Sequence, residues 1–115
     1  MTTFSLLLTT SPLASQDVAS ALQFASAALT AGYQIEQIFL YQDAVLLAAA
    51  DIDLPTDEPN LSKQLAGFCQ QHQIPLLYCV TAAEKRGLAM SDSGFIAAGL
   101  AEFAMRLTNS KLVQF

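Results

Sequence analysis

The residues of this 115-residue chain best suited to chemistry are its two cysteines. Cys79 lies near the end of the apolar run 74–80, and the polar-edged segment 81–87 follows it. Such a run predicts a buried strand, and Gly87 is expected to stop the short turn or helix after it. A thiol at this junction faces free backbone N–H groups that favour a thiolate, so Cys79 is a candidate nucleophile.

A structural role for both cysteines is the competing interpretation. Cysteine is among the most buried residue types, and composition and position alone favour an inert core thiol at Cys79. Cys69 lies four residues after Leu65 on the apolar stripe of a predicted helix, so we expect it in the core. Cys69 and His72 are three residues apart, but zinc needs three or four ligands and no second Cys–His pair exists. We therefore expect no metal site.

Other catalytic and binding motifs are missing from the sequence. It has no Walker loop, no G-x-G-x-x-G after the first strand and no G-x-S-x-G elbow, and the acidic segment 51–58 lacks the spacing of a calcium loop. We therefore expect no bound cofactor. Tyr41 and Asp43 close the second predicted strand, where they would either line a small-ligand site or be ordinary strand-end residues.

Composition predicts one folded domain over residues 1–115. Apolar residues make up 53% of the chain and charged residues 13%, which excludes disorder and hints that a partner covers part of the surface. The net charge of −5 and five scattered basic residues argue against direct nucleic-acid binding. No apolar run is long enough to span a membrane and no signal peptide is recognisable, so a cytoplasmic location is expected.

Strand and helix patterns alternate along the chain. Strands are predicted at 3–9, 34–41, 75–80 and 112–115, with helices between Ser15 and Gly32, at 44–50 and from Asn60 to His72. A further helix is predicted from Gly94, with one apolar face made by Ile96, Leu100, Phe103, Ala104 and Leu107. Crossover connections give parallel strands, so we predict an α/β fold, a three-layer α/β/α sandwich with a mainly parallel sheet of four to five strands.

The segment Cys79-Val-Thr-Ala-Ala-Glu-Lys-Arg-Gly87 resembles the cysteine segment of the DsrE/TusD-like sulfurtransferase family, the small sulfur-relay proteins of the DsrE/DsrF/DsrH type. Three further segments resemble the family in the same order: Ser20-Ala-Leu-Gln-Phe-Ala25, Phe39-Leu-Tyr-Gln-Asp-Ala-Val45 and Leu112-Val-Gln-Phe115. The resemblance therefore extends over nearly the whole chain. It implies the same α/β/α sandwich that the alternating pattern predicts.

The resemblance also implies a function. Members relay sulfur as a cysteine persulfide, in tRNA 2-thiouridine synthesis or in sulfur oxidation, and TusD-like subunits do so in an oligomer with related small subunits. A TusA-like carrier is the donor and a TusE-like protein the acceptor. By this resemblance Cys79 is the persulfide-bearing catalytic residue, and Arg86 either steadies the persulfide anion or makes a surface salt bridge.

One departure from the family pattern is the stretch between Gly87 and Gly94, which is shorter than in typical TusD proteins. The partners, the pathway and the oligomeric state therefore stay open. The alternative function is a non-catalytic assembly subunit of the same fold, in which Cys79 is buried and structural. An exposed, reactive Cys79 thiol would favour sulfur transfer.

Overall fold

A computed structural model describes residues 3–9, 17–48, 61–87 and 95–115. The predicted helix caps Ser15 and Asn60, the acidic segment 51–58 and the shortened stretch at 88–94 lie outside these ranges. The helices and strands are β1 (Thr3–Leu8), α1 (Asp17–Thr30), β2 (Gln34–Leu40), the 3₁₀ helix η1 (Gln42–Ala48), α2 (Leu61–His72), β3 (Leu76–Cys79), α3 (Val80–Lys85), β4 (Ile96–Ala98), α4 (Leu100–Arg106), the 3₁₀ turn η2 (Leu107–Asn109) and β5 (Lys111–Gln114).

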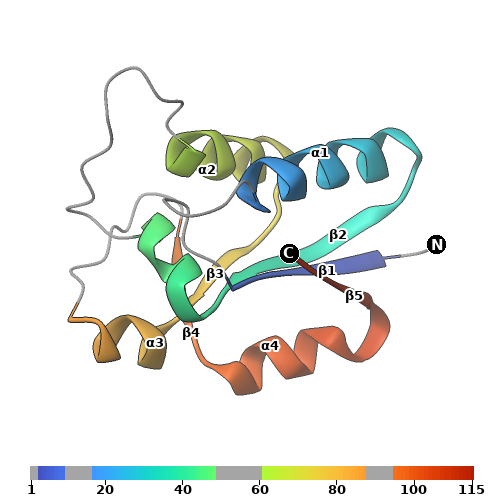
Figure 1. Ribbon diagram of the computed structural model, residues 1–115. Coiled ribbons are helices and arrows are strands. Elements are labelled where there is room, and N and C mark those ends of the chain that lie inside the picture. Colours follow the sequence, from blue (N-terminus) through green and yellow to red (C-terminus); the bar gives the residue numbers. More distant parts are fainter. Residues whose placement is uncertain (1–2, 10–16, 49–60, 88–94) are drawn as a thin grey trace.

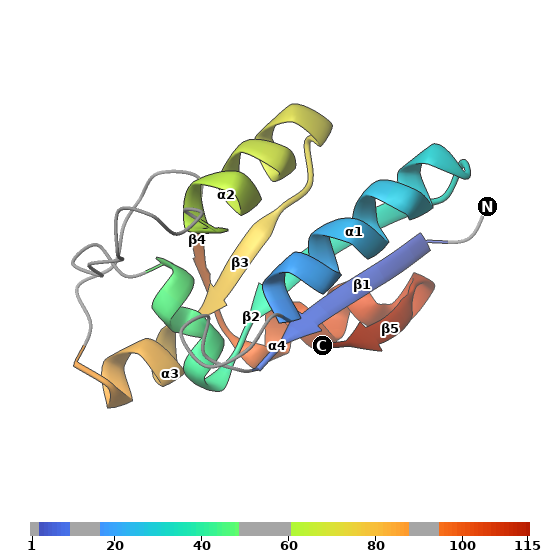
Figure 2. The ribbon, with the colours of Figure 1, turned by 45° about the horizontal axis from the view of Figure 1, so that its top comes forward.

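The strands form one parallel sheet in the order β4-β3-β2-β1-β5. Helices α1 and α2 cover one face and α4 covers the other, while α3 and the green coil of η1 lie side by side where β2 and β3 end (Figures 1 and 2). The predicted three-layer α/β/α architecture with a parallel sheet is confirmed. None of the helices in the described part of the chain is long and apolar enough to cross a membrane.

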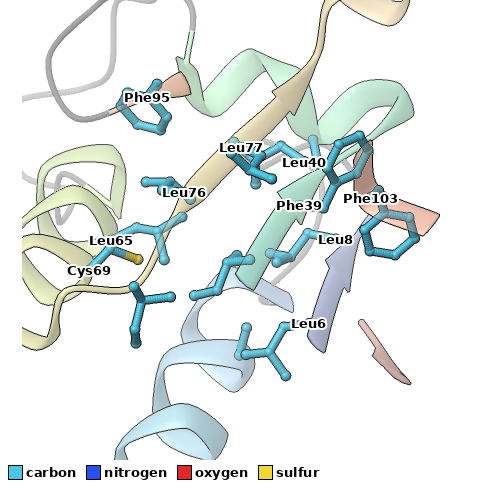
Figure 3. Close-up of a cluster of buried hydrophobic side chains, with 14 of the residues drawn as sticks. Leu6, Leu8, Phe39, Leu40, Leu65, Cys69, Leu76, Leu77, Phe95 and Phe103 are labelled. Carbon is cyan, nitrogen blue, oxygen red and sulfur yellow. The ribbon is translucent and has the colours of Figure 1, made fainter. Parts of the chain in front are cut away.

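Among the described residues, the buried side chains beneath α1 and α2 are apolar. Side chains alternate along a strand, and four residues of β1 and β2 on this face are fully buried: Leu6, Leu8, Ile38 and Leu40. Figure 3 shows Leu6, Leu8 and Leu40 in this cluster. On the opposite face the rings of Phe39 and Phe103 stack with their centroids 4.7 Å apart, which seats α4 on the sheet.

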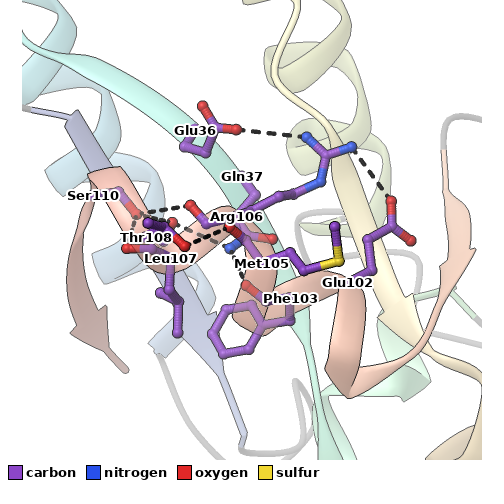
Figure 4. Close-up of polar contacts among 10 residues, drawn as sticks. Glu36, Gln37, Glu102, Phe103, Met105, Arg106, Leu107, Thr108 and Ser110 are labelled. Carbon is purple, nitrogen blue, oxygen red and sulfur yellow. Dashed lines mark hydrogen bonds and ion pairs between the residues drawn. The ribbon is translucent and has the colours of Figure 1, made fainter.

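The face beneath α4 also contains buried polar groups. Gln37 is fully buried in β2, and its amide nitrogen donates to the hydroxyl of Ser5 and to the carbonyl of Phe103, both at 3.2 Å (Figure 4). The hydroxyls of Ser5 and Ser110 are 2.6 Å apart. Because buried polar groups need partners, these bonds fix how the end of α4 and the start of β5 sit on the sheet.

Two helices end in the same hydrogen-bonded turn. After α1, Tyr33 N–H bonds to Ala28 carbonyl and Gly32 N–H to Leu29 carbonyl, and Gly32 has a φ of +92°. This is a Schellman ending, and it confirms the predicted left-handed glycine. After α2, Ile74 N–H bonds to the carbonyl of Cys69 in the same way, although the left-handed residue is Gln73, with a φ of +57°.

The predicted helix from Gly94 is wrong at its beginning. Residues 96–98 form β4, which pairs with β3 through Leu77↔Ile96, Tyr78↔Ala97 and Cys79↔Ala98. The extended Gly99 then separates this strand from α4. The apolar spacing of Ile96, Leu100 and Phe103 suggested one helical face, yet Ile96 is 51% and Leu100 47% exposed. Three residues are too few to show the alternating pattern of a strand, so the helical spacing of the apolar residues was the stronger signal in the sequence.

Candidate functional site

Cys79 is the last residue of β3 and the N-cap residue of α3. β3 is an inner strand, and the carboxyl ends of inner parallel strands are where open α/β sheets hold their ligands and reactive groups. The thiol is covered, however, because Cys79 is only 2% exposed. Its side chain makes no capping hydrogen bond to α3. Position therefore favours a reactive role and burial favours a structural one.

Arg86 lies at the end of α3, and its guanidinium bonds to two groups. Nε and Nη2 donate to the same carboxylate oxygen of Asp43, at 3.0 and 2.9 Å, and Nη1 donates to the carbonyl of Ala82 at 3.0 Å. The side chain of Arg86 is 31% exposed and that of Asp43 is 60% exposed. The surface salt bridge expected as one of two roles for Arg86 is therefore present.

Asp43 comes from η1, directly after the carboxyl end of β2. The left-handed Gln42, with a φ of +51°, turns the chain between β2 and Asp43. Tyr41 is half-buried, and its ring centroid lies 6.4 Å from that of Phe39. Sequence reasoning named Asp43 and Arg86 separately but missed their bond. The signal was available in principle, because both segments follow the ends of neighbouring parallel strands.

Cys69 lies in the core, as predicted. It is 2% exposed on α2 and faces the sheet near Leu65 and Leu76 (Figure 3). Burial raises the pKa of its thiol from the ordinary value of 9.0 to about 12, since the apolar surroundings disfavour the thiolate. A thiol with this pKa is almost entirely protonated at neutral pH, so Cys69 is poorly suited to nucleophilic chemistry.

Metal ligation finds no support among the described residues, where His, Cys, Asp and Glu do not gather in groups of three or more. His72 is exposed at the end of α2, and its ring contacts that of Phe68 with centroids 4.6 Å apart.

A cavity of about 370 Å³ lies near the start of the strands, away from Cys79, and is lined by Thr3, Glu36, Glu102, Met105 and Arg106. Arg106 lies between the two carboxylates, 3.6 Å from Glu36 and 3.3 Å from Glu102 (Figure 4). The charged groups of this cavity therefore pair with one another.

The amino-acid sequence is similar to those of known sulfurtransferases. The chain is 35% identical to "Sulfurtransferase TusD" of Pectobacterium atrosepticum over 129 aligned residues, covering 100% of both chains. It is 34% identical to "Sulfurtransferase TusD homolog" of Vibrio parahaemolyticus, covering 98% of this chain and 97% of the relative. The alignment with the Pectobacterium protein is longer than this 115-residue chain, so that relative contains residues that this chain lacks.

Solved structures give the same result for the fold. The crystal structure of the ychN protein from E. coli superimposes with a TM-score of 0.81 at 22% identity and covers 100% of both chains. The model of the DsrE/DsrF-like family matches residues 3–115, which include every helix and strand described above. This chain therefore belongs to the DsrE/DsrF-like family.

Proposed function

We propose that this protein is a sulfurtransferase subunit that carries sulfur as a persulfide on Cys79. The observation that supports this most is the match to proteins named sulfurtransferase TusD over the full length of both chains. The position of Cys79 supports the choice of residue, because it lies at the carboxyl end of an inner strand. Cys69 is the weaker candidate, since burial raises the pKa of its thiol to about 12.

The proposed step is an exchange between a thiolate and a persulfide. The Cys79 thiolate attacks the terminal sulfur of the donor persulfide, a new S–S bond to Cys79 forms, and the donor's S–S bond breaks. The donor leaves as a thiolate, which takes up a proton from water. The transferred sulfur keeps its oxidation state, so the step needs no oxidant or reductant. Arg86, once released from Asp43, has N–H groups that would steady the persulfide anion.

The proposed partners follow from the resemblance to the DsrE/TusD-like family, and the TusD names of the relatives support a sulfur-relay role. The chain would act in the cytoplasm with related small subunits, receive sulfur from a TusA-like donor and pass it to a TusE-like acceptor. Direct contact with RNA is not proposed, because the net charge is −5 and the five basic residues form no run.

One observation favours a second function, that of a non-catalytic assembly subunit. Cys79 is as buried as the core residue Cys69, each being 2% exposed. If the thiol stays covered in every state of the protein, Cys79 is structural, and the chain contributes only its surface to the assembly.

Mass spectrometry of the intact protein after incubation with a persulfide donor tests both functions. The wild type and Cys69→Ser are expected to gain one sulfur that a reductant removes, whereas Cys79→Ser gains none. Sulfur that still loads on Cys79→Ser but not on Cys69→Ser would overturn the assignment. No adduct on the wild type, together with slow alkylation of Cys79 in the folded protein, would support the assembly subunit.

A further inference from the structure

The sulfur exchange proposed for Cys79 requires a thiol that a second protein can reach, whereas the thiol is buried. Cys79 is 2% exposed, and two residues of α3, Ala82 at 5% and Ala83 at 3%, are also buried. The S–S bond can form only when the attacking sulfur meets the donor's terminal sulfur in line. Part of the cover over Cys79 therefore has to move before sulfur is exchanged.

The element best able to move is α3. It has six residues, and a helix this short is not stable by itself, so packing and polar contacts hold it in position. Cys79 is the N-cap residue of α3, without a capping hydrogen bond from its side chain, and Arg86 is the C-cap residue. A tilt of α3 away from η1 would change the surroundings of Cys79 without breaking the pairing between β2 and β3.

One guanidinium connects α3 to η1. Arg86 donates to the carbonyl of Ala82 within α3, and two of its N–H groups reach one carboxylate oxygen of Asp43 in η1. The neighbouring residues Ala44 and Val45 are fully buried, so η1 is anchored in the core and gives Arg86 a fixed partner. The ion pair itself is at the surface, with Asp43 60% exposed, so solvent and other molecules can reach it.

We propose that the Asp43–Arg86 pair is a latch that holds α3 against η1 and keeps Cys79 covered. Release of the pair lets α3 tilt and exposes the thiol. The biological role of the latch rests on the proposed function: while Arg86 is bound to Asp43, the cover over Cys79 would protect a bound persulfide from water and reductant. Its existence can be tested without any sulfur chemistry.

The test measures how fast iodoacetamide alkylates Cys79 in the folded protein, with mass spectrometry of peptides to separate Cys79 from Cys69. We expect Asp43→Ala to raise the alkylation rate at Cys79 about fivefold. This factor corresponds to the loss of an exposed ion pair whose stabilising free energy is near the upper end of the usual range for such pairs. Asp43→Glu keeps a carboxylate and is expected to restore most of the protection. Arg86→Lys keeps the charge but loses the two N–H groups on one oxygen, and should behave like Asp43→Ala.

Glu102→Gln is the matched control. It weakens a comparable exposed pair, that with Arg106 on α4, and should leave alkylation of Cys79 unchanged. In 1 M salt, where the Debye length is about 3 Å, the wild type should approach the rate of Asp43→Ala while the variant changes little.

An unchanged rate at Cys79 in both Asp43→Ala and Arg86→Lys would overturn the latch. So would an equal acceleration at Cys69, because that pattern indicates general unfolding. Sulfur loading of the same variants separates the two proposals. Faster alkylation without loading of any variant or of the wild type would refute sulfur transfer and leave the latch intact. Loading of the wild type together with unchanged alkylation rates would refute the latch alone.

Discussion

The two cysteines of this protein are equally buried but differ in what would have to move to expose them. Cys69 lies within the twelve-residue helix α2 against the sheet, so exposing it requires that α2 leave the core. Cys79 lies at the junction of β3 and the six-residue α3, and the latch that we propose requires a shift of this one short helix. An exposed fraction in one state therefore does not separate a structural thiol from a reactive one, because the cost of exposing a thiol also depends on how large an element has to move.

The largest expected effect concerns Cys69 in alkaline solution. The pKa of the Cys69 thiol is about 12 in the folded protein, against an ordinary value of 9.0 when exposed. Below pH 9 the Cys69 thiol keeps its proton in both the folded and the unfolded protein, and its contribution to the free energy of unfolding is fully present. Between pH 9 and 12 only the unfolded state loses the proton, so the free energy of unfolding should fall by about 1.4 kcal/mol per pH unit, about 4 kcal/mol in all.

Urea unfolding of the wild type and Cys69→Ala, at intervals from pH 8 to pH 11, measures this effect. Other groups titrate in the same range in both proteins, so the quantity compared is the difference between their free energies of unfolding at each pH. This difference should decrease as the pH rises above 9. A difference that stays constant with pH would show that Cys69 ionises as easily in the folded protein as in the unfolded chain.

The next largest effect is expected from replacing each cysteine with serine. Cys69→Ser buries a hydroxyl among apolar side chains and should lower the free energy of unfolding by about 1–3 kcal/mol. Cys79→Ser is expected to cost less, because Cys79 is the N-cap of α3 and a serine there can accept a hydrogen bond from the first turn. Denaturant unfolding at pH 7 measures both, and equal losses would contradict the difference between the two environments.

The smallest effect concerns the left-handed residues that follow α3 and α2. Gly87 after α3 has a φ of +62°, which costs an L-residue about 1 kcal/mol, and a Cβ there would meet no atom within 4 Å. Gly87→Ala should therefore destabilise the protein by about 1 kcal/mol, and it should speed alkylation of Cys79 but not of Cys69.

Gln73 after α2 is the matched control, since it already bears a side chain at a φ of +57°. Gln73→Ala should change the free energy of unfolding by less than about 0.5 kcal/mol. If both substitutions had the same effect, the left-handed conformation of Gly87 would have no particular role at the end of α3.

The sequence predicted most of the fold because its long elements have clear patterns. The Schellman glycine Gly32, the apolar stripe of α2 and the apolar strand β3 each follow from local spacing, and alternation of strands and helices was enough to predict a parallel sheet. The strand β4 was missed because three residues do not establish a period, and because their pairing with β3 depends on residues distant in the sequence.

The candidate site was predicted only in part. Cys79, Asp43 and Arg86 were all named from the sequence, but the bond between Asp43 and Arg86 joins residues 43 positions apart and depends on the order of the strands. The 2% exposure of Cys79 agrees with the buried thiol that composition and position favoured, whereas local patterns gave no information on its pairing with Ala98 of β4. The part of this site that sequence spacing missed is therefore the contact between the two segments, on which the proposed latch depends.

The ladder between β1 and β5 has a consequence for folding kinetics. It pairs Phe4 with Lys111, and like every other ladder in this sheet it is parallel, so no two neighbouring strands are joined by a tight hairpin. Forming it closes a loop of more than a hundred residues, and that loss of chain entropy must precede the gain from pairing. We therefore expect β5 to join the sheet late in folding, after β1 and β2 have paired. On the ribosome, this last strand could be added only once residues 111–114 have emerged from the exit tunnel.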